Sequence, residues 1–175
     1  MVKLPGESTK IYQAIRDNIK PILTGTMLVI DPSIGSMSSM PGWALSQAGV
    51  LVYSGTLKID PTMENWEKLR ELHRLLRNMS LDFQPDICCF EQVPVSAHGG
   101  RSQVSHATLL MAVGVTMCAV QADRFIGLAP NMWKPKVRST YVKSDENDAK
   151  EMAWIAIEIA KEILRTDPPR RYRSL

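Results

Sequence analysis

The sequence predicts a single α/β domain in which helices cover a five-stranded mixed sheet. Three short strand-like runs follow one another early in the chain, as they do in an antiparallel meander. Two further strand-like runs then alternate with long helical patterns, which is typical of strands joined by crossover helices. The 175 residues, of which 45% are hydrophobic and 22% charged, suffice for one such domain with a substantial core.

The first half of the chain is expected to form a short helix and the meander. The helix spans residues 9–20, has its aliphatic residues on one side and ends at Pro21. The strands that follow are predicted at residues 26–31, 43–47 and 50–59. A loop rich in Ser and Met, residues 32–41, separates the first two strands, and Ala48-Gly49 joins the last two in a tight turn.

The second half alternates helices and strands. Pro61 and Thr62 open a helix that runs to residue 79, and its predicted buried stripe consists of Trp66, Leu69, Leu72 (or His73) and Leu76. The remaining elements are a strand over 86–91, a buried helix over 104–122, a strand over 125–128 and a final helix over 145–164. Ser144 is placed to cap this last helix.

The cysteines and the polar N-terminus indicate a soluble, cytoplasmic protein. Cys88, Cys89 and Cys118 lie in apolar surroundings and fit no zinc-ligand spacing, so they are expected to be small buried residues in a reducing compartment. Residues 1–10 lack the apolar core of a signal peptide. The nearly uncharged run 107–122 is shorter than the roughly 20 residues that cross a bilayer, so no membrane partner is expected.

The formal charge of +3 and the pI of 8.8 are only mildly basic, but the basic residues are clustered. Residues 131–143 contain basic side chains and no acidic one, and residues 165–173 add four arginines against a single aspartate. Such clusters contact phosphates in some proteins and are solvated surface in others. The candidate DNA-binding residues are Arg101, Lys134, Lys136, Arg138 and Lys143.

Four acidic residues occupy positions that indicate a metal site. Asp31 and Glu91 each end an apolar strand, and Asp145 and Asp148 begin the last helix. If the two strands are neighbours, alternation turns their terminal carboxylates to the same face, where they repel each other without a cation. Because hard divalent cations prefer oxygen ligands, the four acids predict a site for Mg²⁺ or Mn²⁺.

Each acid also has an ordinary structural explanation. Asp31 precedes a proline, a common way to start a turn. An acidic first turn complements the helix macrodipole, by about 0.3–1 kcal/mol per residue. However, the helical projection places Asp145 within the apolar stripe of the last helix and Asp148 at its edge, so both are expected to point toward the sheet.

The order of elements and the places of the acids resemble the ribonuclease H-like nuclease fold and, within it, the RuvC-type Holliday-junction resolvases, including small viral and phage versions. The matching pieces are Ile30-Asp31-Pro32, Gly42-Trp43-Ala44, Phe90-Glu91-Gln92, Ser105-His106-Ala107-Thr108-Leu109 before Gly114, Trp133-Lys134 and Asp145-Glu146-Asn147-Asp148-Ala149. The resemblance divides the chain into an N-terminal extension with a short helix (1–23), a nuclease domain (24–166) and a basic tail (167–175).

The resemblance implies a sheet with a three-stranded antiparallel meander and two parallel strands, and hydrolysis of phosphodiester bonds with two Mg²⁺ or Mn²⁺ ions. Asp31 would bridge both ions, and Glu91 and either Asp148 or Asp145 would hold one ion each. One ion would activate the attacking water and the other would stabilise the leaving 3′ oxygen. Lys143 and Lys134 would stabilise charge on the phosphate or bind the DNA backbone.

The resemblance also implies the substrate and the partner. Four-way DNA junctions would be cut by paired symmetric nicks, which requires two sites and therefore a homodimer, in a bacterial cell or in the host cell of a virus. Met111, Val115 and Met117 are candidates for the dimer interface or for the intradomain core. Met37 and Met40, in the loop after Asp31, are candidates for a wedge into the junction.

Two other functions compete with this one. On the same fold, the protein would be a nuclease for flaps and other branched DNAs or for RNA–DNA hybrids. In a different class, it would be a DNA-binding scaffold without catalysis, although the presence of all four carboxylates argues against a scaffold.

Overall fold

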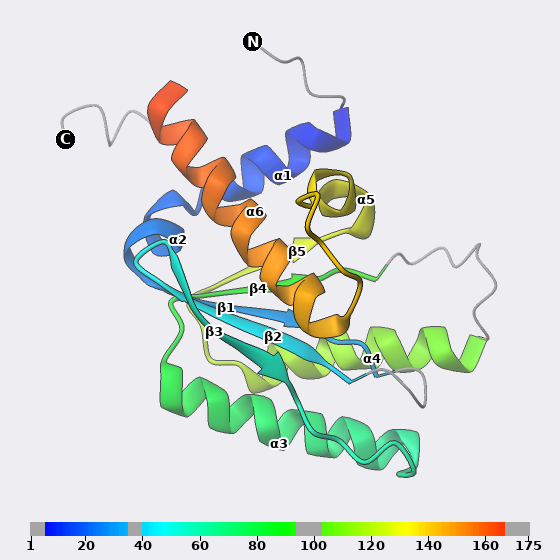
Figure 1. Ribbon diagram of the computed structural model, residues 1–175. Helices are drawn as coiled ribbons and strands as arrows, with labels where there is room; N and C mark the ends of the chain where they lie inside the picture. The colour runs from blue at the N-terminus through cyan, green and yellow to red at the C-terminus, as the bar shows by residue number, and fades with distance from the viewer. Residues whose placement is uncertain (1–5, 35–39, 94–102, 167–175) are drawn as a thin grey trace.

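A mixed sheet of five strands forms the centre of the molecule, with helices on both faces (Figure 1). The computed structural model describes residues 6–34, 40–93 and 103–166. The strands are β1 (Thr26–Asp31), β2 (Gly42–Gln47), β3 (Val50–Thr56), β4 (Ile87–Glu91) and β5 (Arg124–Leu128), in the spatial order β3-β2-β1-β4-β5. This arrangement confirms the predicted α/β class and the five-stranded mixed sheet.

The sheet is antiparallel in its first half and parallel in its second. β1 pairs antiparallel with β2, and β2 with β3, through a tight turn in which Ala48 and Gly49 both have positive φ. A two-residue turn with positive φ at both positions has a backbone twist that matches the twist of the two strands it joins. β1 pairs parallel with β4, and β4 with β5. The carboxyl ends of these three strands therefore lie at one edge of the sheet, where β1 ends at Asp31 and β4 at Glu91.

Strand alternation divides the core into two layers. On one face, Met27 and Val29 join a buried cluster with α1 (Gly6–Arg16), α2 (Ile19–Thr24) and α6 (Asp145–Thr166). On the other face, Leu28 and Ile30 pack in a second cluster with α3 (Asn65–Phe83) and α4 (Gln103–Ala119). Asp31 continues the alternation of Met27 and Val29, so its side chain points to the face that α6 covers.

The N-terminal segment forms two helices rather than one. Pro21 was expected to end a helix, but it lies in the first turn of α2, where a missing N–H removes no helical hydrogen bond. Ile11 in α1 and Ile22 in α2 are almost completely buried in the cluster around α6. Figure 1 shows α1 and α2 on the same side of the sheet as α6.

Several predicted boundaries are wrong for local reasons. β3 ends at Thr56 instead of residue 59, and α3 begins at Asn65, where Glu64 and Glu67 form a capping box. Trp66 was predicted to be buried, yet 60% of it is exposed, because it lies about a quarter turn away from the stripe of Leu72 and Leu76. The guanidinium of Arg70 lies 5.1 Å from the centre of its ring instead.

The remaining helices differ less from the prediction. α4 ends at Ala119, and α6 continues to Thr166. The connection predicted as a basic loop contains the short helix α5 (Pro130–Trp133) and a turn of 3₁₀ helix, Lys134–Lys136. Within the described part of the chain, no helix combines the length and the apolar character that crossing a membrane requires.

Candidate metal centre

Three carboxylates from three different elements meet at the carboxyl edge of the parallel strands. Asp31 at the end of β1, Glu91 at the end of β4 and Asp148 in the first turns of α6 each offer an oxygen, and these oxygens lie within 4.8 Å of one another. The parallel register of β1 with β4, which pairs Ile30 with Phe90, brings the first two together. The two strands are therefore neighbours, which is the condition under which their terminal carboxylates were expected to lie close together.

Asp31 is the most deeply buried of the three. Its side chain accepts a hydrogen bond from Ser33 Oγ at 2.8 Å through Oδ1, whereas the buried Oδ2 has no hydrogen-bond partner among the described residues. Burial, and then the nearby charge of Glu91, raise the pKa of Asp31 to about 8. A buried carboxylate oxygen without a partner is costly, and a bound cation removes this cost. The site therefore fits a hard divalent ion.

Glu91 faces a basic side chain from the α5 region. Lys134 Nζ lies 3.4 Å from Glu91 Oε1, and 14% of the Glu91 side chain is exposed. The ammonium of Lys134 also lies 5.1 Å from the ring centre of Trp133, which is completely buried. Lys134 is thus held at the edge of the carboxylate group, where its positive charge lies beside Glu91.

Asp148 lies in the opening turns of α6, which are capped as predicted. Ser144 Oγ accepts a hydrogen bond from the backbone N–H of Asn147 at 3.2 Å, and the N–H of Asp148 donates to the Ser144 carbonyl at 2.8 Å. The phenol of Tyr141 donates a hydrogen bond to Asp148 Oδ1. Burial and this hydrogen bond raise the pKa of Tyr141, so its hydroxyl stays protonated.

Asp145 lies beside the group without joining it. Its Oδ2 accepts a hydrogen bond from the backbone N–H of Met40 at 2.9 Å. Burial raises the pKa of Asp145, and the Met40 hydrogen bond opposes that shift. The helical projection had placed Asp145 further inward than Asp148, but the structure shows the reverse, since Asp148 is buried and Asp145 only partly so.

A glycine allows α6 to approach the sheet this closely. Gly42 opens β2 and pairs with Asp31 across the strands. A Cβ atom at residue 42 would lie 1.8 Å from the carbonyl oxygen of Asp145, a distance that no side chain tolerates. Glycine at this position therefore lets the first turn of α6 lie directly over the sheet edge that carries Asp31.

Comparison with solved structures finds RuvC of Thermus thermophilus. A T. thermophilus RuvC structure in complex with Holliday junction substrate superposes with a TM-score of 0.56 at 15% identity, covering 80% of this chain and 94% of that one. A second T. thermophilus RuvC structure gives a TM-score of 0.51 at 14% identity, covering 80% and 95%. The fold is RuvC-like. No family model and no curated protein matches the sequence.

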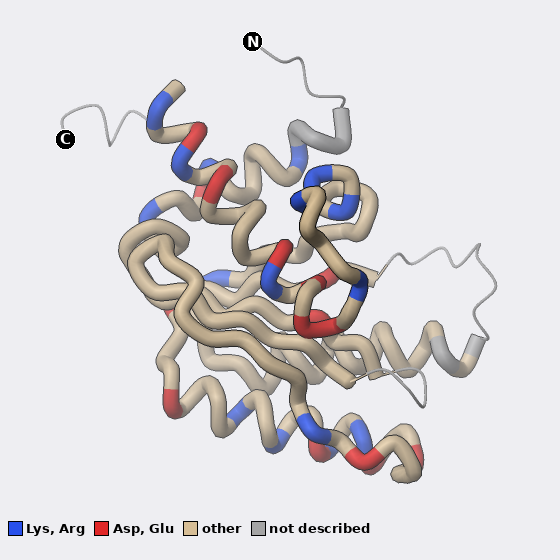
Figure 2. The backbone as a smooth tube through the Cα atoms, in the orientation of Figure 1, with Lys and Arg blue, Asp and Glu red and all other residues tan. Residues whose placement is uncertain are grey.

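In this RuvC-like fold, the predicted DNA-binding residues differ in their exposure and in their partners. Lys134 lies at Glu91, and Lys143 is exposed just before α6, where its charge opposes in part the rise that burial causes in the pKa of Asp145. Lys136 is partly buried, and Arg138 binds Glu151 instead of projecting freely. Figure 2 shows the basic residues of the α5 region above the acidic first turn of α6. Arg101 and Met37 lie outside the described residues.

Sequence reasoning missed three residues that shape the site. Tyr141 and Glu151 gave no signal, because one lies in an irregular segment and the other projects away from the apolar stripe of α6. Glu151 is nevertheless buried, since the segment before α6 covers it. Ser33 had a weak signal: a hydroxyl two residues after an aspartate commonly bonds back to it.

Proposed function

We propose that the protein is a metal-dependent endonuclease that cuts four-way DNA junctions by paired symmetric nicks. The observation that carries the proposal is the group of Asp31, Glu91 and Asp148, in which a buried oxygen of Asp31 has no partner among the described residues. A RuvC-like fold supports the choice of substrate, because a structure with this fold has been solved with a Holliday junction.

Each carboxylate would have a distinct task. Asp31, at the centre of the sheet edge, would bridge two Mg²⁺ or Mn²⁺ ions, and Glu91 and Asp148 would hold one ion each. Bound ions of this kind lower the pKa of an attacking water and stabilise a leaving oxygen. Asp145 would complete the acidic set from its position beside the group, where Met40 N–H orients its carboxylate.

The basic residues would recognise the phosphate backbone. Lys134 would contact the scissile phosphate, because its ammonium already lies at Glu91. Lys143, Lys136 and Arg101 would bind neighbouring phosphates, the contacts that dominate affinity for DNA. Met40, whose backbone touches Asp145, would lie next to the junction and act as a wedge.

A homodimer would supply two sites for the two nicks. Along α4, Val104, Leu110, Met111 and Met117 are exposed apolar side chains. Val115, also a candidate from the sequence, is partly buried against the core cluster below α4. The exposed apolar side chains of α4 would form the interface between protomers. Such a dimer would act on DNA in the cytoplasm of a bacterial cell or of a virus-infected host cell.

The test is cleavage of a labelled synthetic four-way junction with Mg²⁺ or Mn²⁺, beside linear duplex, flap and RNA–DNA hybrid. The variant Asp31→Asn removes the central charge, and Asp82→Asn, at an exposed position on α3, is the matched control. Paired nicks that disappear in Asp31→Asn, while junction binding persists, would support the proposal.

Other outcomes would redirect it. Equal cutting of flaps would make the protein a general debranching nuclease, and cutting of the hybrid would make it a ribonuclease H. Absence of metal-dependent cutting on every substrate would overturn the catalytic proposal and leave a DNA-binding scaffold.

A further inference from the structure

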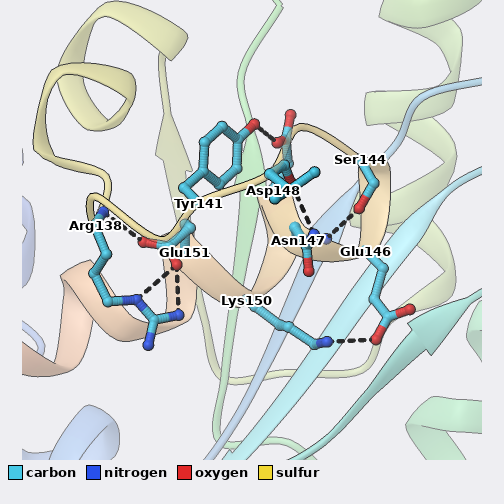
Figure 3. Close-up of polar contacts among 9 residues, drawn as sticks. Arg138, Tyr141, Ser144, Glu146, Asn147, Asp148, Lys150 and Glu151 are labelled. Carbon is cyan, nitrogen blue, oxygen red and sulfur yellow. Dashed lines mark hydrogen bonds and ion pairs between the residues drawn. The ribbon is translucent and has the colours of Figure 1, made fainter.

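In the segment between the 3₁₀ turn and α6, residues 137–144, the side chains of Arg138 and Tyr141 both contact α6 (Figure 3). Arg138 binds Glu151, and Tyr141 donates a hydrogen bond to Asp148. Asp148 and Glu151 are three residues apart on α6, so their side chains lie on neighbouring positions of the same helix surface. The segment therefore runs along the side of α6 that carries the metal-site aspartate.

Arg138 makes more contacts with α6 than Tyr141 does. Its Nε donates to Glu151 Oε1 at 2.7 Å, and its backbone N–H donates to Glu151 Oε2 at 3.2 Å. Its guanidinium also lies 5.2 Å from the centre of the Trp154 ring. Because Glu151 is only 3% exposed, this charge has Arg138 as its ion-pair partner in a largely dry position. A buried carboxylate that loses such a partner is strongly destabilised, so Arg138 stays in place.

A short turn connects Arg138 to Tyr141, whose phenol contacts Asp148 at the metal site. The N–H of Tyr141 donates to the Arg138 carbonyl at 2.9 Å, which closes a β-turn between the two residues. A further hydrogen bond of 2.8 Å, from Asn147 Nδ2 to the Val142 carbonyl, holds the chain just after Tyr141. Hydrogen bonds therefore hold the backbone before and after Tyr141, and this backbone places the phenol beside Asp148.

We infer that Tyr141 is a positioning residue for Asp148, and that the Arg138–Glu151 pair acts through it; this inference rests on the proposed metal-dependent nuclease. The phenol donates a hydrogen bond to Oδ1 and so restricts the rotation of the carboxylate. A carboxylate has about four acceptor sites, so lone pairs remain for an ion after one hydrogen bond is made. Tyr141 holds Asp148 toward Asp31 and Glu91 before any ion binds.

This positioning role explains why Arg138, which was predicted from the sequence to bind DNA, forms an ion pair with Glu151 instead. If Arg138 bound phosphate, the buried charge of Glu151 would lose its partner each time DNA arrived. Instead, its contacts order the segment that leads to Tyr141. Groups that hydrogen-bond to metal-ligating side chains typically change metal affinity by about 10–100-fold when they are removed.

The direct test is Tyr141→Phe, with Tyr53→Phe, an exposed tyrosine on β3, as the matched control. Mn²⁺ affinity is measured by isothermal titration calorimetry without DNA, and junction cutting is measured across a range of Mn²⁺ concentrations. We expect Tyr141→Phe to bind Mn²⁺ about 10–100-fold more weakly, and its cutting to recover at high Mn²⁺. Tyr53→Phe should match the wild type in both measurements.

A second pair of variants tests the anchor. Arg138→Lys keeps the charge and loses the forked geometry, and Lys161→Arg alters an exposed ion pair with Glu158 on the same helix as the control. Arg138→Lys should weaken Mn²⁺ binding, whereas Lys161→Arg should not. If Arg138 acts through Tyr141, the double variant Tyr141→Phe/Arg138→Lys should bind Mn²⁺ as weakly as Tyr141→Phe alone.

Asp148→Asn separates the failure of this inference from the failure of the proposed function. If Asp148→Asn weakens Mn²⁺ binding and Tyr141→Phe binds like the wild type, the positioning role is wrong and the metal site stands. If Asp148→Asn itself leaves Mn²⁺ affinity unchanged, the proposed metal site is wrong and the positioning role falls with it. A lower melting temperature of Tyr141→Phe without any change in affinity would indicate a purely structural contact.

Discussion

Gly42 and Asp145 touch backbone to backbone, and a Cβ atom at residue 42 would lie 1.8 Å from the Asp145 carbonyl oxygen. Gly42 is also the strand partner of Asp31. One glycine therefore sets the distance between the central aspartate of the sheet and the helix that supplies Asp148. The tripeptide Gly42-Trp43-Ala44, first noted as a sequence motif, has this packing role in the structure.

Gly42→Ala is expected to displace the start of α6 and to weaken both stability and metal binding. Overpacking of this kind typically costs about 1–3 kcal/mol, because backbone must move to admit the methyl group. Chemical denaturation measures the loss, and Mn²⁺ titration measures the effect on the site. Gly114→Ala is the control: its Cβ would meet nothing within 4 Å, and alanine in a helix should stabilise by about 0.5–1 kcal/mol. Equal stability of both variants would contradict the close approach.

The stability of the metal-free protein should fall as the pH rises from about 4 to about 8. The pKa of Asp31 is raised from 3.8 to about 8 by burial and by Glu91, so in this range the folded state binds a proton that the unfolded state has released. The stability that this proton contributes is fully present below the pKa of Asp31 in the unfolded state. It is lost as the pH rises through the pKa of Asp31 in the folded state. Thermal unfolding in chelator measures the slope, and Asp31→Asn should flatten it. A slope that is unchanged in Asp31→Asn would assign the titration to another group.

Divalent ions should offset the loss of stability that the metal-free protein shows at high pH. An ion that binds only the folded state at 100 times its dissociation constant stabilises the protein by about 2.7 kcal/mol. Because protons compete for the carboxylates, the rise in melting temperature with Mg²⁺ or Mn²⁺ should be larger at pH 8 than at pH 5. Asp82→Asn should show the same rise as the wild type, and Asp31→Asn should show little. An equal rise in all three proteins would indicate binding outside the site.

Lys134→Ala is expected to slow cutting more than it weakens DNA binding. Its ammonium, 3.4 Å from Glu91, is placed to stabilise charge on the reacting phosphate, and removal of such a group typically costs about 10²–10³-fold in rate. Single-turnover cutting and junction binding in Ca²⁺ separate the two effects. Lys161→Ala, which removes an exposed lysine from α6, is the control. A proportional loss of binding and rate would make Lys134 a simple backbone contact.

Replacing the exposed methionines of α4 should separate the proposed dimer. Met111 and Met117 are 51% and 46% exposed, so Met111→Glu/Met117→Glu leaves the core intact and places charges on the predicted interface. Sedimentation should show a monomer, and the junction should receive uncoupled single nicks. Leu81→Glu, at an equally exposed leucine on α3, is the control and should remain dimeric. A wild-type protein that sediments as a monomer would overturn the homodimer.

Sequence reasoning predicted the central features of the fold because they depend on local patterns. Alternation along β1 and β4 places Asp31 and Glu91 correctly, and the capping residue Ser144 marks the start of α6. The same local logic failed where a long-range contact decided the outcome. Asp148 is buried more deeply than Asp145 because the segment carrying Tyr141 covers it, and the helical projection contains no information about that segment.

The sequence by itself determined the order of the five strands and the three long helices α3, α4 and α6, the two apolar faces of the sheet and the acids at the strand ends, because periodicity and capping act between residues close in the chain. Only the tertiary structure decided which aspartate joins Asp31 and Glu91, that Lys134 faces Glu91, and that Arg138 binds Glu151. These contacts join residues from separate elements, or from an irregular segment to a helix. Their geometry follows from how the α5 region and α6 pack on the sheet, and no spacing along the chain specifies that packing.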